Sequence, residues 1–92
     1  MANVALGFVE TRGDTGSIVA LDSMLKAANV DLAKKVSIGG GYVTVVIRGE
    51  VGAVKSAIEA GTEAAAAVGE LVCVNVIPSA HEDVFGLIGI KK

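Results

Sequence analysis

The most informative stretch of this chain is Ser37-Ile38-Gly39-Gly40-Gly41-Tyr42-Val43-Thr44-Val45-Val46-Ile47-Arg48, three glycines followed by a strand-like run. In that run apolar residues recur at every second position, at Val43, Val45 and Ile47. This pattern predicts a strand with one face more apolar than the other. The glycines supply no acid, nucleophile or metal ligand, but they let backbone approach a ligand or another copy closely. Their spacing leaves two interpretations open, a β-bulge or hairpin turn and a loop crowded against symmetry-related copies.

Ser37 beside the glycines also invites comparison with phosphate-binding loops. Such loops end in Gly-Lys-Ser/Thr, or they have spaced glycines that open a helix. Here the glycines lead into a strand, so the sequence matches neither pattern.

Around the strand at 42–48, hydrophobic periodicity predicts two more strands before it and one after it, two helices and a short helical turn. The predicted strands cover residues 4–9, 31–38, 42–48 and 70–77, the helices cover 17–29 and 50–68, and the turn covers 81–85. Asp14-Thr15-Gly16 offers turn and cap chemistry before the first helix. The order β-α-β-β-α-β predicts a ferredoxin-like α+β sandwich, with the helices on one sheet face.

Each main helix has a predicted buried stripe at helical spacing. On the first helix the stripe is Ile18, Leu21, Leu25 and Ala28, and on the second it is Val51, Val54, Ile58, Gly61, Ala65 and Val68. Gly61 within its stripe predicts a close approach to the sheet.

Composition predicts a domain that hides apolar surface against other subunits. The chain has 92 residues, one small domain, yet 52% are apolar and the mean hydropathy is +0.64. Aromatics are only 3%, so most apolar side chains are alanine and valine, which suit close, flat packing. Apolar surface in excess of what one small domain can bury usually marks contacts with partners.

Several function classes are disfavoured. A net charge of −2 without a basic block argues against nucleic-acid binding. Cys73 is the sole cysteine, which permits no internal disulfide or zinc site and fits a reduced, cytoplasmic setting. The sequence shows no signal peptide and no apolar run near the about 20 residues that cross a bilayer. We expect no cofactor, no metal and no membrane partner.

Catalytic groups are scarce. His81 is the sole histidine and lies beside Glu82 and Asp83, but no nucleophile or second catalytic group accompanies it. A capping or interface role is the simpler interpretation. Adjacent residues point in different directions on a helix, which disfavours a metal site there. Lys26 and Asp22 have the spacing of an intrahelical ion pair worth about 0.2–0.5 kcal/mol.

Taken together, the segments resemble the single-domain, hexameric shell proteins of bacterial microcompartments, from residue 5 to about residue 84. The resemblance rests on ALGFVETRG at 5–13, MLKAANV at 24–30, GGGYVTV at 39–45, RGEVGAV at 48–54, VGELV at 68–72 and VIPSAH at 76–81. It implies one shell domain over residues 1–92, with a core of about 4–84 and a tail of 85–92. The implied fold is a circularly permuted relative of the ferredoxin-like sandwich, and no catalysis is implied.

The resemblance also implies a cyclic homohexamer that forms a flat tile with a narrow central pore. Tiles join edge to edge, with like hexamers and other shell proteins, around encapsulated enzymes in the cytoplasm. The pore loop falls on Ser37, Ile38, Gly39, Gly40 and Gly41. The common family pattern there is Lys-Ile-Gly-Ser-Gly, and the triple glycine followed by tyrosine is similar to carboxysome hexamers. Such a rim offers backbone amides that favour small anionic or polar metabolites, but it lacks the lysine that would add positive potential.

The tile edge that the resemblance implies includes Lys26 and Asn29, and we place Asp22, Ser79 and His81 there as well. Ser79 stands where the family has an arginine, so a five-donor fork is missing. The expected consequence is a weaker edge contact, or compensation by another residue. Two rival functions remain at this point: a ferredoxin-like regulatory domain that grips a small anion with the glycine loop, and an enzyme that uses His81.

Overall fold

The computed structural model describes residues 4–90. Its elements follow the predicted order, and some bounds differ from the predicted ones by several residues. They are β1 (Ala5–Arg12), α1 (Asp14–Ala27), β2 (Asp31–Gly39), β3 (Tyr42–Gly49), α2 (Val51–Ala67), β4 (Leu71–Ile77) and α3 (Glu82–Ile88). Helix α1 already begins at Asp14, so the segment predicted as a turn forms its first helical turn.

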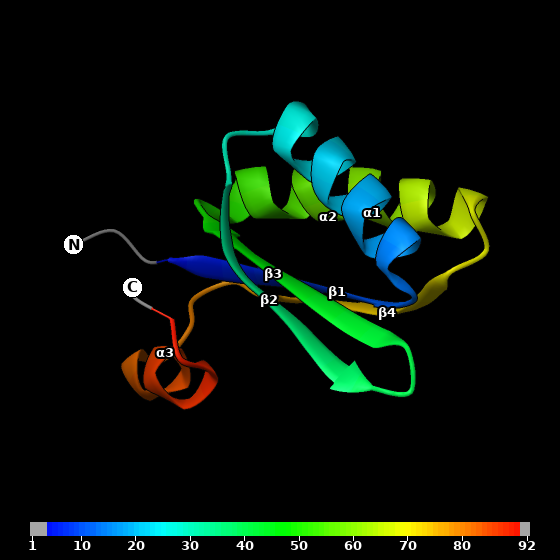
Figure 1. Ribbon diagram of the computed structural model, residues 1–92. Coiled ribbons are helices and arrows are strands. Elements are labelled where there is room, and N and C mark those ends of the chain that lie inside the picture. The colour runs from blue at the N-terminus through cyan, green and yellow to red at the C-terminus, as the bar shows by residue number, and fades with distance from the viewer. Residues whose placement is uncertain (1–3, 91–92) are drawn as a thin grey trace.

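The four strands form one sheet in the order β2-β3-β1-β4, and all three pairings are antiparallel. Helices α1 and α2 lie side by side over one face of this sheet, while α3 lies on the opposite side (Figure 1). The predicted fold class, an α+β sandwich with two main helices on one face and a short C-terminal helix, is confirmed.

The main core lies between the sheet and the two long helices. Because side chains alternate along a strand, Val9, Val45 and Ile47 all face the helices. Met24 of α1 and Val54 of α2 close this layer from above, and both are fully buried. Its remaining buried members are Ala5, Ala20, Val30, Ala57, Ile58 and Ala65.

The predicted buried face of α1 is wrong at Ile18 and Leu25, whereas Leu21 and Ala28 are half-buried and pack against the main core. The fully buried face lies one position earlier than predicted. Ile18 and Leu25 are 56% and 43% exposed, whereas Gly16, Ser17, Ala20 and Met24 are the buried residues. A shift of one residue rotates the face by about 100°. The small residues face inward because α1 must lie close to both α2 and the sheet. The buried Ser17 hydroxyl is satisfied, since it donates to the Asp14 carbonyl at 2.8 Å.

The buried face of α2 is largely as predicted, with Val54, Ile58, Gly61 and Ala65 buried. Val68 is the exception at 44% exposed, because α2 ends just before it. Gly61 does permit a close approach, but to α1 and not to the sheet. A Cβ atom on Gly61 would stand 2.7 Å from Cγ and 2.8 Å from Sδ of Met24.

The opposite face of the sheet is covered at one end by α3. Phe85 is 3% exposed and forms a second buried cluster with Leu6 and Val46. The Lys34 ammonium on β2 donates to the Ile88 carbonyl at 2.7 Å, which satisfies an acceptor at the end of α3. These contacts order α3 to Ile88, beyond the predicted end at residue 85.

Candidate functional site

The glycine run forms the turn of the β2–β3 hairpin, so the hairpin interpretation is confirmed for the single chain. Gly39, Gly40 and Gly41 all have positive φ, at 92°, 67° and 83°. That region of backbone space is costly for other L-residues, which is why three glycines occur here. The pairing of β2 with β3 also shifts register between Ser37 and Gly39, as a bulge does. We call residues 37–41 the glycine hairpin.

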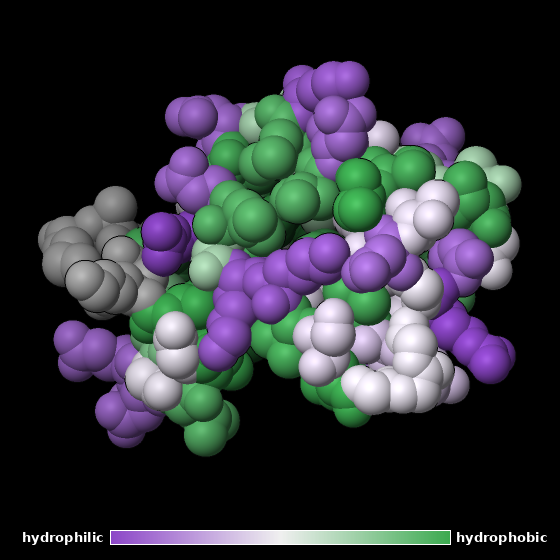
Figure 2. All heavy atoms as spheres, in the orientation of Figure 1, coloured by the Kyte–Doolittle hydropathy of each residue, from purple (hydrophilic) through white to green (hydrophobic). Residues whose placement is uncertain are grey.

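The glycine hairpin extends away from the rest of the chain. Ile38 is 64% exposed, and a Cβ atom on Gly39 would meet nothing within 4 Å. On Gly40 the same atom would meet just the edge of the Tyr42 ring, at 3.3 Å. The corner of the molecule where β2 turns into β3 is pale in Figure 2, so it is neither strongly apolar nor strongly polar. What it offers to a partner is backbone, one serine hydroxyl and one isoleucine.

The end of β1 fixes the base of this hairpin. The Gly13 amide donates to the Gly41 carbonyl, and the Arg12 amide donates to the Glu70 carbonyl at 2.9 Å. A small hollow of about 170 Å³ lies between the base of the hairpin and the start of α1. Its lining residues are Gly13, Asp14, Ser37, Gly39, Gly41, Tyr42 and Val43. Asp14 beside it pairs with the Lys35 ammonium at 3.2 Å.

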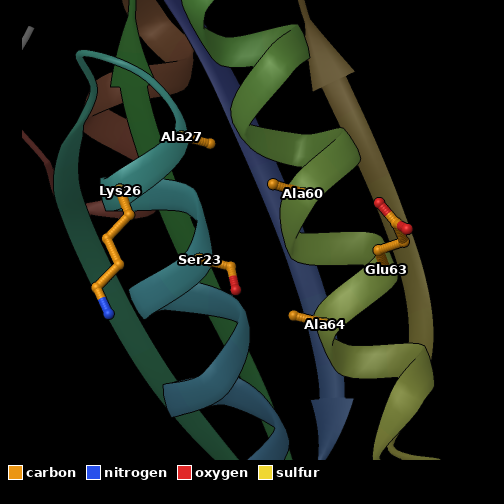
Figure 3. A pocket seen from close by; sticks show the side chains of 6 residues that line it. All are labelled: Ser23, Lys26, Ala27, Ala60, Glu63 and Ala64. Carbon is orange, nitrogen blue, oxygen red and sulfur yellow. The ribbon is translucent and has the colours of Figure 1, made fainter.

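The candidate edge residues on α1 are found at its C-terminal end. Lys26 and Asp22 form the predicted intrahelical ion pair, with 2.9 Å between Nζ and Oδ2. Both side chains are exposed, and Asn29 follows the helix on the surface. Lys26 also borders a depression of about 530 Å³ between α1 and α2, where Ser23 and Ala27 face Ala60 and Ala64 (Figure 3).

Ser79 and His81 lie after β4, on the way to α3. The His81 side chain caps α3, since Nδ1 accepts a hydrogen bond from the Asp83 amide at 3.1 Å. The capping interpretation of His81 is thus confirmed. Within residues 4–90, no hydrogen bond or ion pair joins Ser79 or His81 to Lys26. In one chain the edge candidates therefore form two separate groups.

One charged residue near the hairpin was missed by the sequence prediction, namely Arg12. It is the last residue of β1 and lies directly opposite Tyr42 of β3. Its Cγ atom is 3.9 Å from the place where a Cβ atom on Gly41 would stand. The alternation of Phe8, Glu10 and Arg12 gives the face of this side chain, but its proximity to the glycines follows from the β1–β3 register, which the sequence does not state.

Cys73 lies on β4 opposite Glu10 of β1. Desolvation of the thiolate raises the pKa of the Cys73 thiol, and the Glu10 carboxylate raises it further, as acceptor of a 3.4 Å hydrogen bond from Sγ and through its charge. Because the thiolate is the reactive form, Glu10→Gln is expected to lower the pH midpoint of iodoacetamide alkylation. Glu59→Gln, on exposed α2 surface, is the control. Equal midpoints in wild type and Glu10→Gln would show that Glu10 does not influence the thiol.

Among residues 4–90, no helix is both long and apolar enough to cross a membrane. The same residues contain no group of three or more histidine, cysteine, aspartate or glutamate side chains placed to hold a metal ion.

The chain matches known proteins over most of its length. The family model "BMC domain" matches residues 5–80. The bacterial microcompartment shell protein PduA of Citrobacter freundii is 55% identical over 84 residues, which are 91% of this chain and 90% of PduA. The carboxysome shell protein CsoS1A of Hydrogenovibrio crunogenus is 49% identical over 90 residues, 97% of this chain and 94% of the relative.

A solved structure agrees with the sequence relatives. A microcompartment protein from Desulfitobacterium hafniense DCB superposes with a TM-score of 0.85 at 33% identity. The match covers 99% of this chain and 50% of that protein, so this chain spans half of it. The fold, the family model and the relatives all agree: the chain belongs to the BMC domain family of bacterial microcompartment shell proteins.

Proposed function

We propose that this chain is a structural tile without catalytic activity: six copies close into a ring, and the six glycine hairpins line a central pore. The observation that carries the proposal is the exposed hairpin with three consecutive left-handed glycines, in a chain of the shell-protein family. Backbone this bare lets six copies approach one axis closely without side chains blocking it. A rim of amides and serine hydroxyls suits small polar or anionic metabolites.

The flanks of the protomer support a ring. Large apolar side chains are exposed on the α1–β2 flank, at Ile18, Leu25 and Leu32, and on the β4 flank, at Val72 and Val74. The outer edges of β2 and β4 also have no strand partner in the described chain. A closed ring is built by joining two different surfaces of the protomer head to tail. The same contact would cover the unpaired outer edges of strands β2 and β4, which otherwise invite aggregation. Apolar atoms do reach the surface beside α1 in Figure 2.

Rings of this kind would join edge to edge through Asp22, Lys26, Asn29, Ser79 and His81, with like rings and other shell proteins. The result is a facet of a shell in the bacterial cytoplasm, and the encapsulated enzymes would lie behind it. At a two-fold edge each Lys26 meets its own copy, so its ammonium group needs carbonyl or carboxylate acceptors. The two groups of edge residues that are separate within one chain would then meet across the contact between tiles.

Lys26→Ala is expected to reduce or abolish extended layers while leaving single rings intact. Within one chain Lys26 contributes just an exposed intrahelical ion pair, worth about 0.2–0.5 kcal/mol, so folding should hardly change. Negative-stain electron microscopy of purified protein at increasing concentration checks layer formation. Lys55→Ala on exposed α2 surface is the matched control and should keep forming layers. Undiminished layers with Lys26→Ala would remove Lys26 from the edge.

A further inference from the structure

The charges beside the glycine hairpin differ between the two faces of the sheet. On the helix face, Asp14 begins α1 and pairs with Lys35 at 3.2 Å. Lys35 belongs to this face because it lies opposite Val45, whose side chain is in the main core beneath the helices. The Asp14 charge is therefore compensated within the chain.

On the α3 face Arg12 carries a positive charge beside the hairpin, opposite Tyr42 of β3. Strand alternation puts its side chain on the same face as Leu6 and Phe8, which pack with α3. Its backbone is held in place, because the Arg12 amide donates a hydrogen bond to the Glu70 carbonyl and the Gly13 amide donates one to the Gly41 carbonyl. The side chain is exposed, and among residues 4–90 no ion pair holds its guanidinium.

Glu10 is a carboxylate on this face, but it does not neutralise the charge of Arg12. Glu10 lies two residues earlier on β1, and its side chain accepts from Cys73 on β4 at 3.4 Å. Strand β4 lies on the side of β1 opposite to β3 and the glycine hairpin. Ser37 in the hairpin itself adds a hydroxyl without charge. Lys34 on β2 is also on this face, but its ammonium is held by the Ile88 carbonyl at 2.7 Å. Arg12 lies directly opposite Tyr42, the residue that follows the hairpin, and its Cγ atom is 3.9 Å from the Cβ position on Gly41.

We propose that Arg12 sets the charge preference of the pore, by placing a ring of guanidinium groups at the mouth on the α3 face. The inference rests on the proposed function, since it requires that six glycine hairpins meet around one axis. Rings of arginine or lysine select anions in pores, and converging like charges raise the local concentration of counter-ions. The guanidinium fork matches carboxylate and phosphate oxygens, so small metabolites that carry these groups are the expected class.

The test is the ion selectivity of assembled rings in a planar bilayer, with a tenfold gradient of potassium chloride. The wild type is expected to prefer chloride over potassium several-fold at low salt, and less so as salt rises and screens the ring. Arg12→Gln should lose most of this preference, and Arg12→Glu should invert the sign of the reversal potential. Arg12→Lys keeps the charge and should retain the preference. Lys55→Gln, distant in sequence and on exposed α2 surface, should match the wild type.

The possible outcomes distinguish a failure of the Arg12 inference from a failure of the proposed pore. Conducting rings whose reversal potential is the same in wild type and Arg12→Gln, or a wild type that prefers potassium, would overturn the role of Arg12 and leave the pore in place. Rings that are intact by electron microscopy but do not conduct would overturn the pore itself, and the Arg12 inference with it. If Arg12→Gln fails to form rings, the comparison of Arg12→Lys with Arg12→Glu decides the question.

Discussion

Gly40→Leu is expected to slow small-molecule flux through assembled shells at least about tenfold, since each 1.4 kcal/mol of added barrier costs a factor of ten in rate. Gly40 stands at the tip of the glycine hairpin, and a Cβ atom there meets just the Tyr42 ring. Six leucine side chains would therefore extend into the opening that the glycines leave. Passage of a fluorescent anionic tracer into shells of defined composition measures the effect.

The control for this experiment is Gly69→Leu. Gly69 also has positive φ, at 74°, and a Cβ atom there would meet nothing within 4 Å. Leucine at either position should cost roughly 1–2 kcal/mol of backbone strain, so the two variants are matched in destabilisation. Gly69→Leu is expected to leave flux near the wild-type value. Equal flux in Gly40→Leu and wild type shells would show that metabolites cross elsewhere.

Met24→Ala is expected to destabilise the fold by about 2–5 kcal/mol, out of a typical total of about 5–15 kcal/mol. Met24 is fully buried, and its Cγ and Sδ atoms fill the space over Gly61. Urea unfolding at a fixed protein concentration measures the cost, because association makes apparent stability depend on concentration.

Gly61→Ala alters the same contact from the α2 side, because it pushes a methyl group into the Met24 side chain. It should reduce the free energy of unfolding by roughly 1–3 kcal/mol. In the double variant the new methyl group occupies part of the space that Met24 leaves. The combined loss should therefore be smaller than the sum of the single losses by about 0.5 kcal/mol or more. Gly86→Ala is the control, since that helical glycine has open space around it and should tolerate alanine or gain up to about 1 kcal/mol. Strict additivity of Met24→Ala and Gly61→Ala would contradict the proposed contact.

The fold could be predicted from the sequence where hydrophobic periodicity is strong. Strand β3 shows clear alternation at Val43, Val45 and Ile47, and the sheet uses it as predicted. Helix α1 was predicted only in part, because two of its large apolar residues, Ile18 and Leu25, stay on the surface of the protomer. A pattern of side-chain size does not reveal that α2 needs small residues opposite it.

The candidate site, too, was predicted from the sequence only in part. Three glycines in a row predicted tight backbone, and their positive φ values agree. The sequence did not indicate Arg12, because its place beside Gly41 depends on the register between β1 and β3. Nor did the sequence indicate that α2 would meet α1 at Gly61, since a glycine in the buried stripe of a helix fits a close approach to a sheet equally well.

The central claim is that six copies of this chain surround a pore lined by residues 37–41. Cryo-electron microscopy of the purified protein tests it most directly, because one map gives both the number of subunits and the position of the hairpin. The account predicts six-membered rings with the glycine hairpins around the axis. A protein that stays monomeric at every concentration, or a ring with the hairpins at its outer edge, would contradict it.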